Sequence, residues 1–565
     1  MKESGIGTVI QNTDIQAKIS AWMFYVMILL CVSIPLSEFG MSASQFLLLG
    51  LWVYEGANFN QSSSRYGISR HLSIITSNLK RKFRKALRNP ALIALIGIYL
   101  LHFIGLIYTQ DLSNGMKDLR IKLPLLSLPI IIATSESLNK KRFGVLMIFF
   151  CLAVFAGSGA SIYALFTRKI SDSRDLSLFI SHIRFSLQIC LAIFTLLIFA
   201  WKRYYSNKWV NISFALLAFW FIYFLFILKS MTGIVILGIV FIILGFIWMF
   251  RHKALVIPSI VLIIILFTGG WLYIRDVYKG ITIAERVDFD TLDKYTALGN
   301  PYQHDTISFG IEYGKHVGLY LSVPELRDAW NSRSHIEYYN ADNKGQSIRF
   351  TLIRYLHSKG LRKDAEGVYK LTNEDIALIE NGVANSQLLG RVNIRGRVEQ
   401  ALQGYSSYMK NGNPNASSIM QRFEYWKTSI YLIEKQPIFG YGTGDLNMAF
   451  EKGYRETNTS LLPEFRHRSH NQFLAITIAL GVLGFIIFMV SLFFPPIRIG
   501  KFSNILYLVF FLISFFSFLT EDTLETQAGV TFFSFFSAVL IFGVKGEVDH
   551  ILKYGIFRKS KSKEA

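Results

Sequence analysis

Long stretches without charge recur through the chain, and they set the main limit on how it can fold. A run of about 17 to 25 apolar residues can cross a bilayer as a helix. Twelve such candidate spans lie near residues 20–37, 40–56, 91–108, 122–136, 143–165, 185–200, 209–228, 232–250, 254–274, 471–494, 504–520 and 528–544. Apolar side chains make up 52% of the sequence, as expected of a membrane protein. The sequence predicts an all-α polytopic membrane protein with about twelve transmembrane helices.

The spans divide the chain into parts. We expect a nine-span N-terminal bundle, an external domain, a three-span C-terminal bundle and a basic tail, at residues 1–274, 275–470, 471–544 and 545–565. A structureless loop as long as the second part is improbable, so it should have its own fold. Its signals are mainly helical: Thr372 with Asp375 resembles a capping box, and a second helix is predicted over 415–436, before Pro437.

Lysine and arginine gather at alternate ends of the spans. The stretch 57–90 carries eight of them and no acid. Because short basic loops remain in the cytoplasm, we expect this stretch and both termini to be cytoplasmic and residues 275–470 to be external. The positive charge is scattered over span ends, which argues against a nucleic-acid partner.

Positive side chains on the predicted outer side break this distribution and are candidates for function. They are Lys117, Arg120, Lys122, Arg168, Lys169, Arg174, Arg184, Lys229, Arg422, Arg466 and Arg468, with His470. Guanidinium groups match phosphate oxygens and neutralise their charge. We expect Arg184, Arg120, Lys117, Arg466 and Arg468 to bind a phosphate or pyrophosphate in an outer cavity. The alternative, strongest for Arg168, Lys169 and Lys229, is snorkelling to the lipid headgroups.

His470 directly precedes the uncharged run 472–490. Gly481 lies roughly 16 Å along that helix at ~1.5 Å per residue. Gly481 and Gly484 share one face, where they would let a neighbouring helix approach closely. The arginines beside His470 favour a neutral ring, which can accept a proton. His470 is therefore a candidate general base, and the alternative is a structural histidine.

Two further groups are candidate ligand contacts. Arg422 and Trp426 lie four residues apart on one helical face, so the arginine could reach a ligand while the indole packs on a sugar or the membrane. A cation–π pair between them is the alternative. Glu521, Asp522 and Glu525 form an acidic turn between the last two spans, which could bind sugar hydroxyls, orient the arginines or cap the turn in water.

The motif around His470 resembles the O-antigen ligase and O-antigen polymerase superfamily of bacterial membrane glycosyltransferases. That family's signature is H-[N/S/Q], nine residues, then G-x-x-G and a Gly, Thr or Tyr. Here His470, Asn471, Gly481 and Gly484 match it, and Phe485 departs in the last place.

Three more stretches resemble the same family. Arg422 and Trp426 match an R-x-x-x-W pattern, and residues 437–444 match a P-x-x-G-x-G stretch. The turn at 228–233 is similar to the family's S-[R/K]-x-G turn, with the basic residue before Ser230 instead of after it.

The resemblance implies a function. The donor would be a glycan on undecaprenyl pyrophosphate at the periplasmic face of the bacterial inner membrane, and the acceptor a sugar hydroxyl of lipid A–core. His470 matches the family's proton acceptor, Arg422 its loop arginine, and Arg184 an arginine at the head of a middle span. The family's reaction is a direct displacement with inversion, in which arginines stabilise the leaving pyrophosphate.

We expect neither metal nor cofactor. Asp288 and Asp290 form a D-x-D pattern used by metal-dependent glycosyltransferases, but three-residue patterns are common by chance. Arginines on the outer side can take the place of Mg²⁺.

Other functions stay open. An O-antigen polymerase, which joins lipid-linked repeat units, would share these motifs. A transfer to protein is less expected. A transporter of the lipid-linked glycan would place ionisable residues deep within its spans, whereas the charges here gather at the outer ends.

Overall fold

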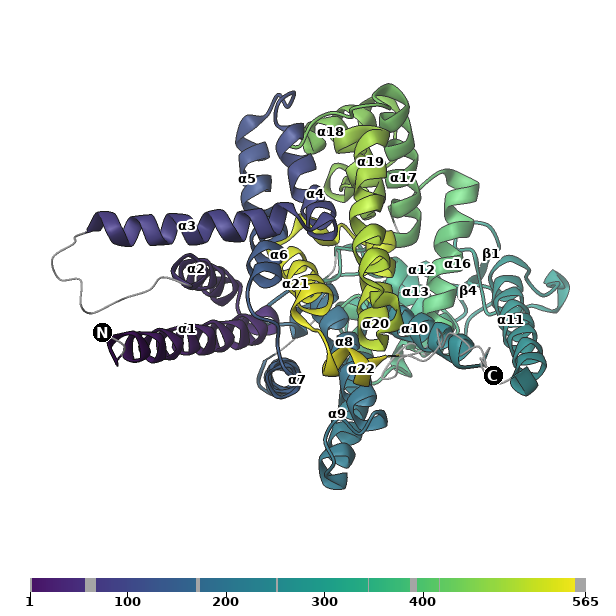
Figure 1. Ribbon diagram of the computed structural model, residues 1–565. Helices are drawn as coiled ribbons and strands as arrows, with labels where there is room; N and C mark the ends of the chain where they lie inside the picture. Colours follow the sequence, from purple (N-terminus) through teal and green to yellow (C-terminus); the bar gives the residue numbers. More distant parts are fainter. Residues whose placement is uncertain are drawn as a thin grey trace. The chain divides into compact units, whose positions relative to one another are not determined.

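The computed structural model describes residues 3–55, 68–168, 173–249, 253–343, 345–386, 394–415 and 417–553. It forms two compact units. The first, which we call the membrane unit, consists of Met1–Lys253 and Arg422–Ala565. The second, which we call the inserted unit, consists of Ala254–Gln421. Both are mainly helical (Figure 1). The division differs from the predicted domain limits at 275 and 470, because residues 425–461 share an apolar core with residues 475–480.

The membrane unit is built from helices that mostly begin at polar caps. They are α1 Glu3–Leu36, α2 Glu38–Tyr54, α3 Ile68–Leu87, α4 Pro90–Gly105, α5 Leu112–Lys122, α6 Pro124–Thr134, α7 Lys140–Thr167, α8 His182–Trp201, α9 Lys208–Ile227, α10 Met231–Met249, α17 Ser418–Lys435 (from Arg422 on), α18 Leu446–Glu456, α19 Gln472–Ile499, α20 Ile505–Thr520, α21 Gln527–Ala538 and α22 Glu547–Leu552. At α4, for example, the Asn89 side chain accepts from the Leu92 amide and Pro90 supplies the first helical residue.

Seven helices among the described residues are long and apolar enough to cross a membrane, or eight if the bent pair α3 and α4 counts as one span. Each of the twelve predicted stretches coincides with an apolar helix. This is the architecture of a polytopic helical membrane protein. The number of twelve crossings stays a prediction.

Two predictions near the start of the chain need correction. The span at 122–136 is the eleven-residue helix α6, which at ~1.5 Å per residue is far shorter than a bilayer of about 30 Å. The basic stretch 57–90 is not a simple loop, since most of it forms helix α3. The part of α3 from residue 75 lies at 94° to α4.

Helix α8 is the most enclosed of the candidate spans, with 83% of its apolar window buried. Gly233 in α10 lets that helix approach α8 closely, because a Cβ at Gly233 would lie 2.6 Å from the Cβ of Ser186. Arg184 precedes this contact by two residues. The packing therefore fixes the end of α8 that carries the arginine.

Helix α19 is broken at Gly481, which has φ +68° and ψ −174°. The predicted helix–helix contact at this glycine is wrong, since the neighbour is the loop after α17. Val482 donates its amide to the Pro437 carbonyl at 2.8 Å, and Tyr441 donates to Ile478 at 2.9 Å. A Cβ at Gly481 would lie 1.9 Å from the Ile438 carbonyl oxygen. The loop thus replaces hydrogen bonds that the unwound helix gives up.

The same loop is joined to the start of α5. Asp445 accepts hydrogen bonds from the backbone amides of Gln110 and Asp111, both at 2.7 Å. Thr443 donates to the His102 carbonyl at 2.7 Å. These bonds hold the segment after α17 against α4 and α5, near the N-terminal end of α19, which follows His470.

The inserted unit contains helices and a few short strands. They are α11 Lys253–Thr282, β1 Gln303–Asp305, β2 Ile311–Glu312, β3 Lys315–His316, β4 Gly318–Leu321, α12 Val323–Asn331, α13 Ile348–Ser358, α14 Ala365–Tyr369, α15 Asn373–Glu380 and α16 Ile394–Asn411. The strands pair β1 with β4 and β2 with β3, both antiparallel. The protein is thus mainly helical, and these few short strands are a departure from the all-α prediction. The capping box of Thr372 and Asp375 is confirmed.

Candidate functional site

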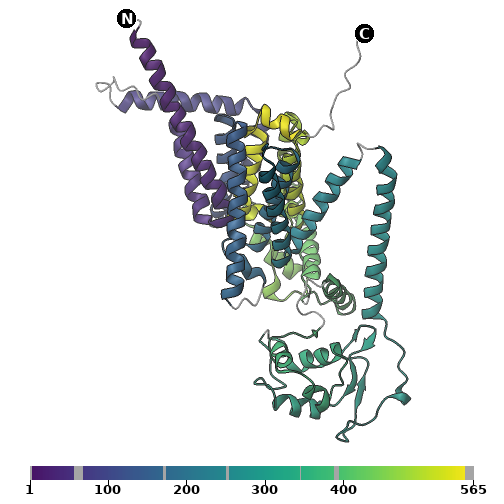
Figure 2. The same ribbon diagram turned by 90° about the horizontal axis from the view of Figure 1, so that it is seen from below.

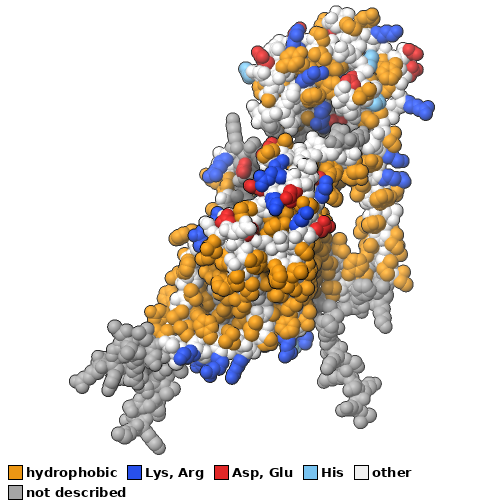
Figure 3. Space-filling view, turned by 90° about the horizontal axis from the view of Figure 1, so that it is seen from above, with side chains coloured by type: hydrophobic (Ala, Val, Ile, Leu, Met, Phe, Trp, Pro, Cys, Tyr) orange, Lys and Arg blue, Asp and Glu red, His pale blue; other side chains and the backbone are white. Residues whose placement is uncertain are grey.

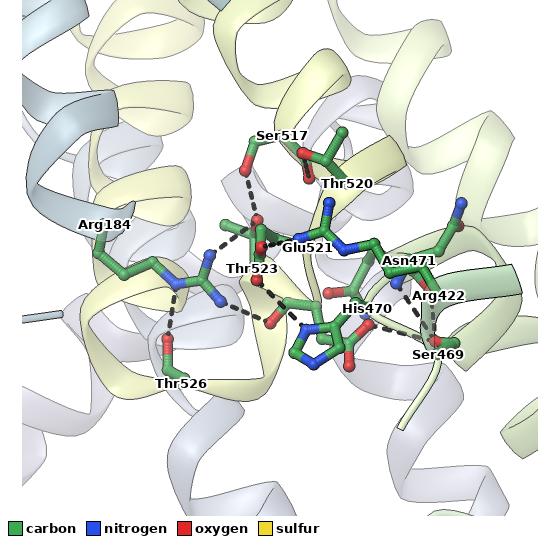
Figure 4. A network of polar contacts seen from close by, with 12 residues as sticks. Arg184, Arg422, Ser469, His470, Asn471, Ser517, Thr520, Glu521, Thr523 and Thr526 are labelled. Carbon is green, nitrogen blue, oxygen red and sulfur yellow. Dashed lines mark hydrogen bonds and ion pairs between the residues drawn. The ribbon is translucent and has the colours of Figure 1, made fainter. Parts of the chain in front are cut away.

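The candidate site is assembled on the acidic turn 521–526, between α20 and α21. Side chains reach this turn from α8, from α17 and from the segment before α19 (Figure 4). All of these elements belong to the membrane unit. The turn therefore brings together residues that are far apart in the sequence.

His470 is held in an unusual backbone conformation. Its φ is +46°, a left-handed conformation that costs a non-glycine residue roughly 1–2 kcal/mol. Asn471 then caps α19, accepting from the amides of Phe473 and Leu474 at 3.0 and 3.1 Å. The ring of His470 is 35% exposed, and its Nδ1 lies 3.5 Å from Oε2 of Glu521. The ring therefore has a carboxylate beside it, in addition to the positive neighbours expected from the sequence.

Arg422 shares the same carboxylate. Its Nη2 donates to Oε1 of Glu521 at 2.9 Å, and its side chain is 33% exposed. One turn further along α17, Trp426 donates its indole N–H to the Ser469 carbonyl at 3.1 Å. The face of α17 that carries Arg422 and Trp426 thus fixes both Glu521 and the backbone before His470.

Arg184 lies behind the turn and is buried. Its Nη2 donates to the Asp522 carbonyl at 2.9 Å. Its Nε and Nη1 face the hydroxyls of Thr526 and Thr523 at 3.2 and 3.4 Å. This guanidinium therefore holds the backbone of the acidic turn.

A buried ionic network secures the other end of the turn. Glu525 Oε2 lies 2.9 Å from Lys122 Nζ and 3.1 Å from Arg468 Nη1, and Lys122 also contacts Asp118 at 2.6 Å. Gln472 at the start of α19 donates to Glu525 at 3.2 Å. Burial would raise the pKa of Glu525, but Lys122 and Arg468 outweigh it and hold this pKa well below its usual value. Glu525 is therefore a charged anchor.

The two neighbouring acids differ in their pKa. Burial acts to raise the pKa of Glu521, yet the hydrogen bond from His470 and the charges of Arg184 and Arg422 hold it below its usual value. Burial raises the pKa of Asp522, and the nearby Glu525 adds to this. Asp522 accepts from the Ser469 hydroxyl at 3.2 Å. Both carboxylates face protein side chains, which fits the alternative that the acids orient the cationic residues.

The remaining predicted cations lie outside this set of contacts. Lys117, Arg120 and Arg168 are exposed, and exposed Arg466 donates its Nε to the Leu461 carbonyl at 3.1 Å. Lys229 is exposed, in the turn between α9 and α10, with φ +53°. Lys169 and the side chain of Arg174 fall outside the described residues.

Asp288 and Asp290 lie in the inserted unit and are exposed. The Asp288 carboxylate accepts from the Asp290 amide at 3.1 Å, so the pattern closes a local turn. Among the described residues no group of three His, Cys, Asp or Glu side chains is placed to hold a metal ion. Metal independence stays a prediction.

Sequence reasoning missed several groups of the site. Ser469 links the histidine segment to Asp522. Lys122 was predicted only as one of the outer cations, whereas it is fully buried. The sequence offered one signal for the Lys122–Glu525 pair, because each of these two charged residues lies next to an apolar span. Nothing in the sequence indicated that Thr523 and Thr526 face Arg184.

Comparisons with known proteins agree with the motif. Residues 381–489 match the model of the O-antigen ligase family, a segment that includes Arg422, His470 and the break at Gly481. An uncharacterized protein of Haemophilus influenzae is 25% identical over 208 residues, which cover 35% of this chain and 50% of that protein. The match therefore spans half the length of this relative. The resemblance to the O-antigen ligase superfamily is confirmed by the family match at residues 381–489.

Proposed function

We propose that this chain is a membrane glycosyltransferase of the O-antigen ligase type. It moves a glycan from undecaprenyl pyrophosphate to a sugar hydroxyl of lipid A–core at the periplasmic face of the inner membrane. The observation that carries the proposal is that Arg422 and His470, both inside the segment that matches the family, contact the two oxygens of one carboxylate, Glu521. A phosphate ligand and a proton acceptor are thereby held side by side.

His470 is the proposed general base. With Glu521 on Nδ1, the free ring nitrogen is Nε2, which takes the proton of the acceptor hydroxyl. The hydroxyl oxygen then bonds to the anomeric carbon of the donor, and the bond from that carbon to the pyrophosphate breaks with inversion. The Glu521 carboxylate stabilises the imidazolium that forms, as a positioning group rather than a sugar ligand.

Arg422 is the proposed direct pyrophosphate ligand. It is one-third exposed, and its guanidinium has donors beyond the single bond to Glu521. Charge develops on the leaving pyrophosphate, where a fixed guanidinium stabilises it. Arg184 acts from behind the turn, adding positive charge and fixing Asp522, while Arg468 is held by Glu525 and Asn447. Exposed Lys117, Arg120 and Arg466 are proposed to guide the anionic donor.

The proposal includes the topology expected from the basic loops. Both termini are cytoplasmic, twelve segments enter the bilayer, and residues 275–470 face the periplasm. A polyprenyl donor must reach the site from the bilayer, so the site opens sideways to lipid. Trp426, whose indole N–H bonds to the Ser469 carbonyl, is proposed to pack on the site segment or on a bound sugar.

An O-antigen polymerase is the second candidate, because the family match covers both activities at this level of detail. The lipopolysaccharide gel profile of a deletion strain separates the two. Accumulated lipid-linked polymer with bare core indicates a ligase, and core carrying one repeat unit indicates a polymerase. A wild-type profile in the deletion strain would exclude both.

A further inference from the structure

Helix α3 carries a surface that the proposed reaction does not use. The chain turns by 94° between α3 and α4, at a break that contains Asn89. From residue 75 on, α3 therefore runs across the direction of the apolar helix α4 that follows it. Figure 2 shows α3 crossing one end of the bundle of the membrane unit.

One side of α3 is fixed to the bundle. Lys82 is buried and donates to the Trp52 carbonyl and, at 2.9 Å, to the carboxylate of Glu55. Lys85 donates to the Thr134 carbonyl at 2.9 Å. These bonds prevent α3 from rotating about its own axis. They therefore determine which of its side chains face away from the bundle.

The outward surface of α3 has an apolar part and a basic part. Phe83 and Leu87 lie four residues apart on one side and are 48% and 70% exposed. The basic part is Lys80, Arg81, Arg84 and Arg88, the last just past the helix end, and all four are exposed. An apolar stripe beside a basic stripe is typical of a helix that lies in the membrane interface.

Among the described residues, no acidic side chain pairs with these four basic groups. Helix α3 contains no acid, and in the described part of the chain its ion pair joins Lys82 to Glu55. Figure 3 shows lysine and arginine side chains along one margin of a hydrophobic belt. A basic surface at the margin of a membrane belt meets lipid headgroups, of which the anionic ones supply the missing charge.

We propose that Lys80, Arg81, Arg84 and Arg88 form a binding surface for the headgroups of anionic phospholipids, while Phe83 and Leu87 enter the adjoining acyl layer. The surface would fix the depth of the bundle at this leaflet. It is independent of the proposed reaction, because it shares no residue with the site on the acidic turn.

A lipid titration tests the proposal on the full chain. Lys80, Arg81, Arg84 and Arg88 are all changed to Gln, and bound phosphatidylglycerol and phosphatidylcholine are counted by native mass spectrometry from a neutral detergent. We expect the preference for phosphatidylglycerol to fall about tenfold or more, because each basic group near the surface contributes. Binding of phosphatidylcholine should not change.

The matched control removes four positive charges from the inserted unit, as Arg286→Gln, Lys294→Gln, Arg327→Gln and Lys370→Gln. It should keep the wild-type preference. An equal loss in this control would assign the effect to net charge and overturn the proposal. Wild-type preference in the α3 variant would overturn it as well.

A second measurement does not depend on the stability of the fourfold variant. Leu87→Cys and Arg84→Cys are labelled separately with a fluorophore in liposomes that contain phosphatidylglycerol; the native cysteines are buried. We expect the label at Leu87 to be quenched by nitroxide on lipid acyl chains and the label at Arg84 by iodide in water. Equal iodide quenching at both positions would show that α3 does not lie in the interface.

Discussion

Oε2 of Glu521 lies 3.5 Å from Nδ1 of His470 while Oε1 of the same carboxylate lies 2.9 Å from Arg422. One side chain therefore fixes both the proposed base and the proposed pyrophosphate ligand. Because α20 ends at Thr520 and the turn follows at once, the carboxylate has a rigid support. In the proposed reaction, Glu521 would stay on His470 when pyrophosphate attracts Arg422.

The first prediction concerns Glu521→Gln. The amide keeps the shape but cannot stabilise the imidazolium, so we expect turnover to fall by about 10²–10⁴-fold with little change in donor binding. Transfer to purified lipid A–core measures turnover, and binding of lipid-linked donor is measured separately. Glu434→Gln, on the same helix as Arg422 but outside the contacts of the site, is the control. Wild-type turnover in Glu521→Gln would exclude the positioning role.

The same carboxylate predicts a pH dependence. The pKa of Glu521 is lowered in the folded protein, so its stabilising contribution is complete above the unfolded pKa and is lost as pH falls through the lowered value. The difference in melting temperature between the wild-type protein and Glu521→Gln should therefore persist at neutral pH and be lost only in acid, below the usual glutamate range. A difference that is lost completely already near neutral pH would contradict this assignment.

The second prediction is that His470→Ala abolishes measurable transfer while the protein still folds and binds donor. Loss of a general base costs about 10²–10⁴-fold, which appears in turnover rather than in binding. His467→Ala is a matched control, because its ring lies 6.0 Å from that of His470 without contacting Glu521. Near wild-type turnover of His470→Ala would reduce this residue to a structural role before α19.

The third prediction separates charge from geometry at Arg422. Arg422→Ala should weaken donor binding as well as turnover, since a guanidinium on pyrophosphate acts in both the ground and transition states. Arg422→Lys should recover only part of the loss, because an ammonium lacks the bidentate fork. Full recovery by lysine would show that charge alone matters at this position. The affinity for pyrophosphate-linked donor and the rate are measured on the same preparations.

The fourth prediction is that transfer by the purified enzyme survives EDTA. The proposed charge stabilisation comes from arginines, and Asp288 and Asp290 close a local turn in the inserted unit. Activity lost in EDTA and restored by Mg²⁺ or Mn²⁺ would contradict the arginine mechanism. Asp288→Asn with Asp290→Asn should then reproduce the loss.

The sequence correctly predicted the features that depend on residues close together in the chain. Apolar length located the helices, and the capping box of Thr372 depends only on residues within one turn. Helix α17 was placed within three residues of its observed limits because Pro437 closes it. These features follow from short-range sterics and hydrogen bonds.

Long-range features could not be read in the same way. The sequence gives no distance between Glu521 and Arg422, which are 99 residues apart, so the acids could be assigned to sugars or to arginines equally well. The spacing of Gly481 and Gly484 predicts a close contact with a neighbouring helix only if the helix that carries them is unbroken. The break at Gly481 exists because a loop from residues 437–441 supplies the missing hydrogen bonds.

The last prediction tests that break. Gly481→Ala should abolish folded protein, since alanine at φ +68° costs on the order of 1–2 kcal/mol and its Cβ would also overlap the Ile438 carbonyl oxygen, 1.9 Å away. That oxygen belongs to the backbone, so no side-chain rotation can relieve the overlap. Gly238→Ala in α10 is the matched control, because a Cβ there meets nothing within 4 Å, and alanine favours a helix interior. Monodisperse protein after size-exclusion chromatography in detergent is the measurement. If Gly481→Ala gave the same yield and melting temperature as Gly238→Ala, the loop would not be paired with α19 at this position.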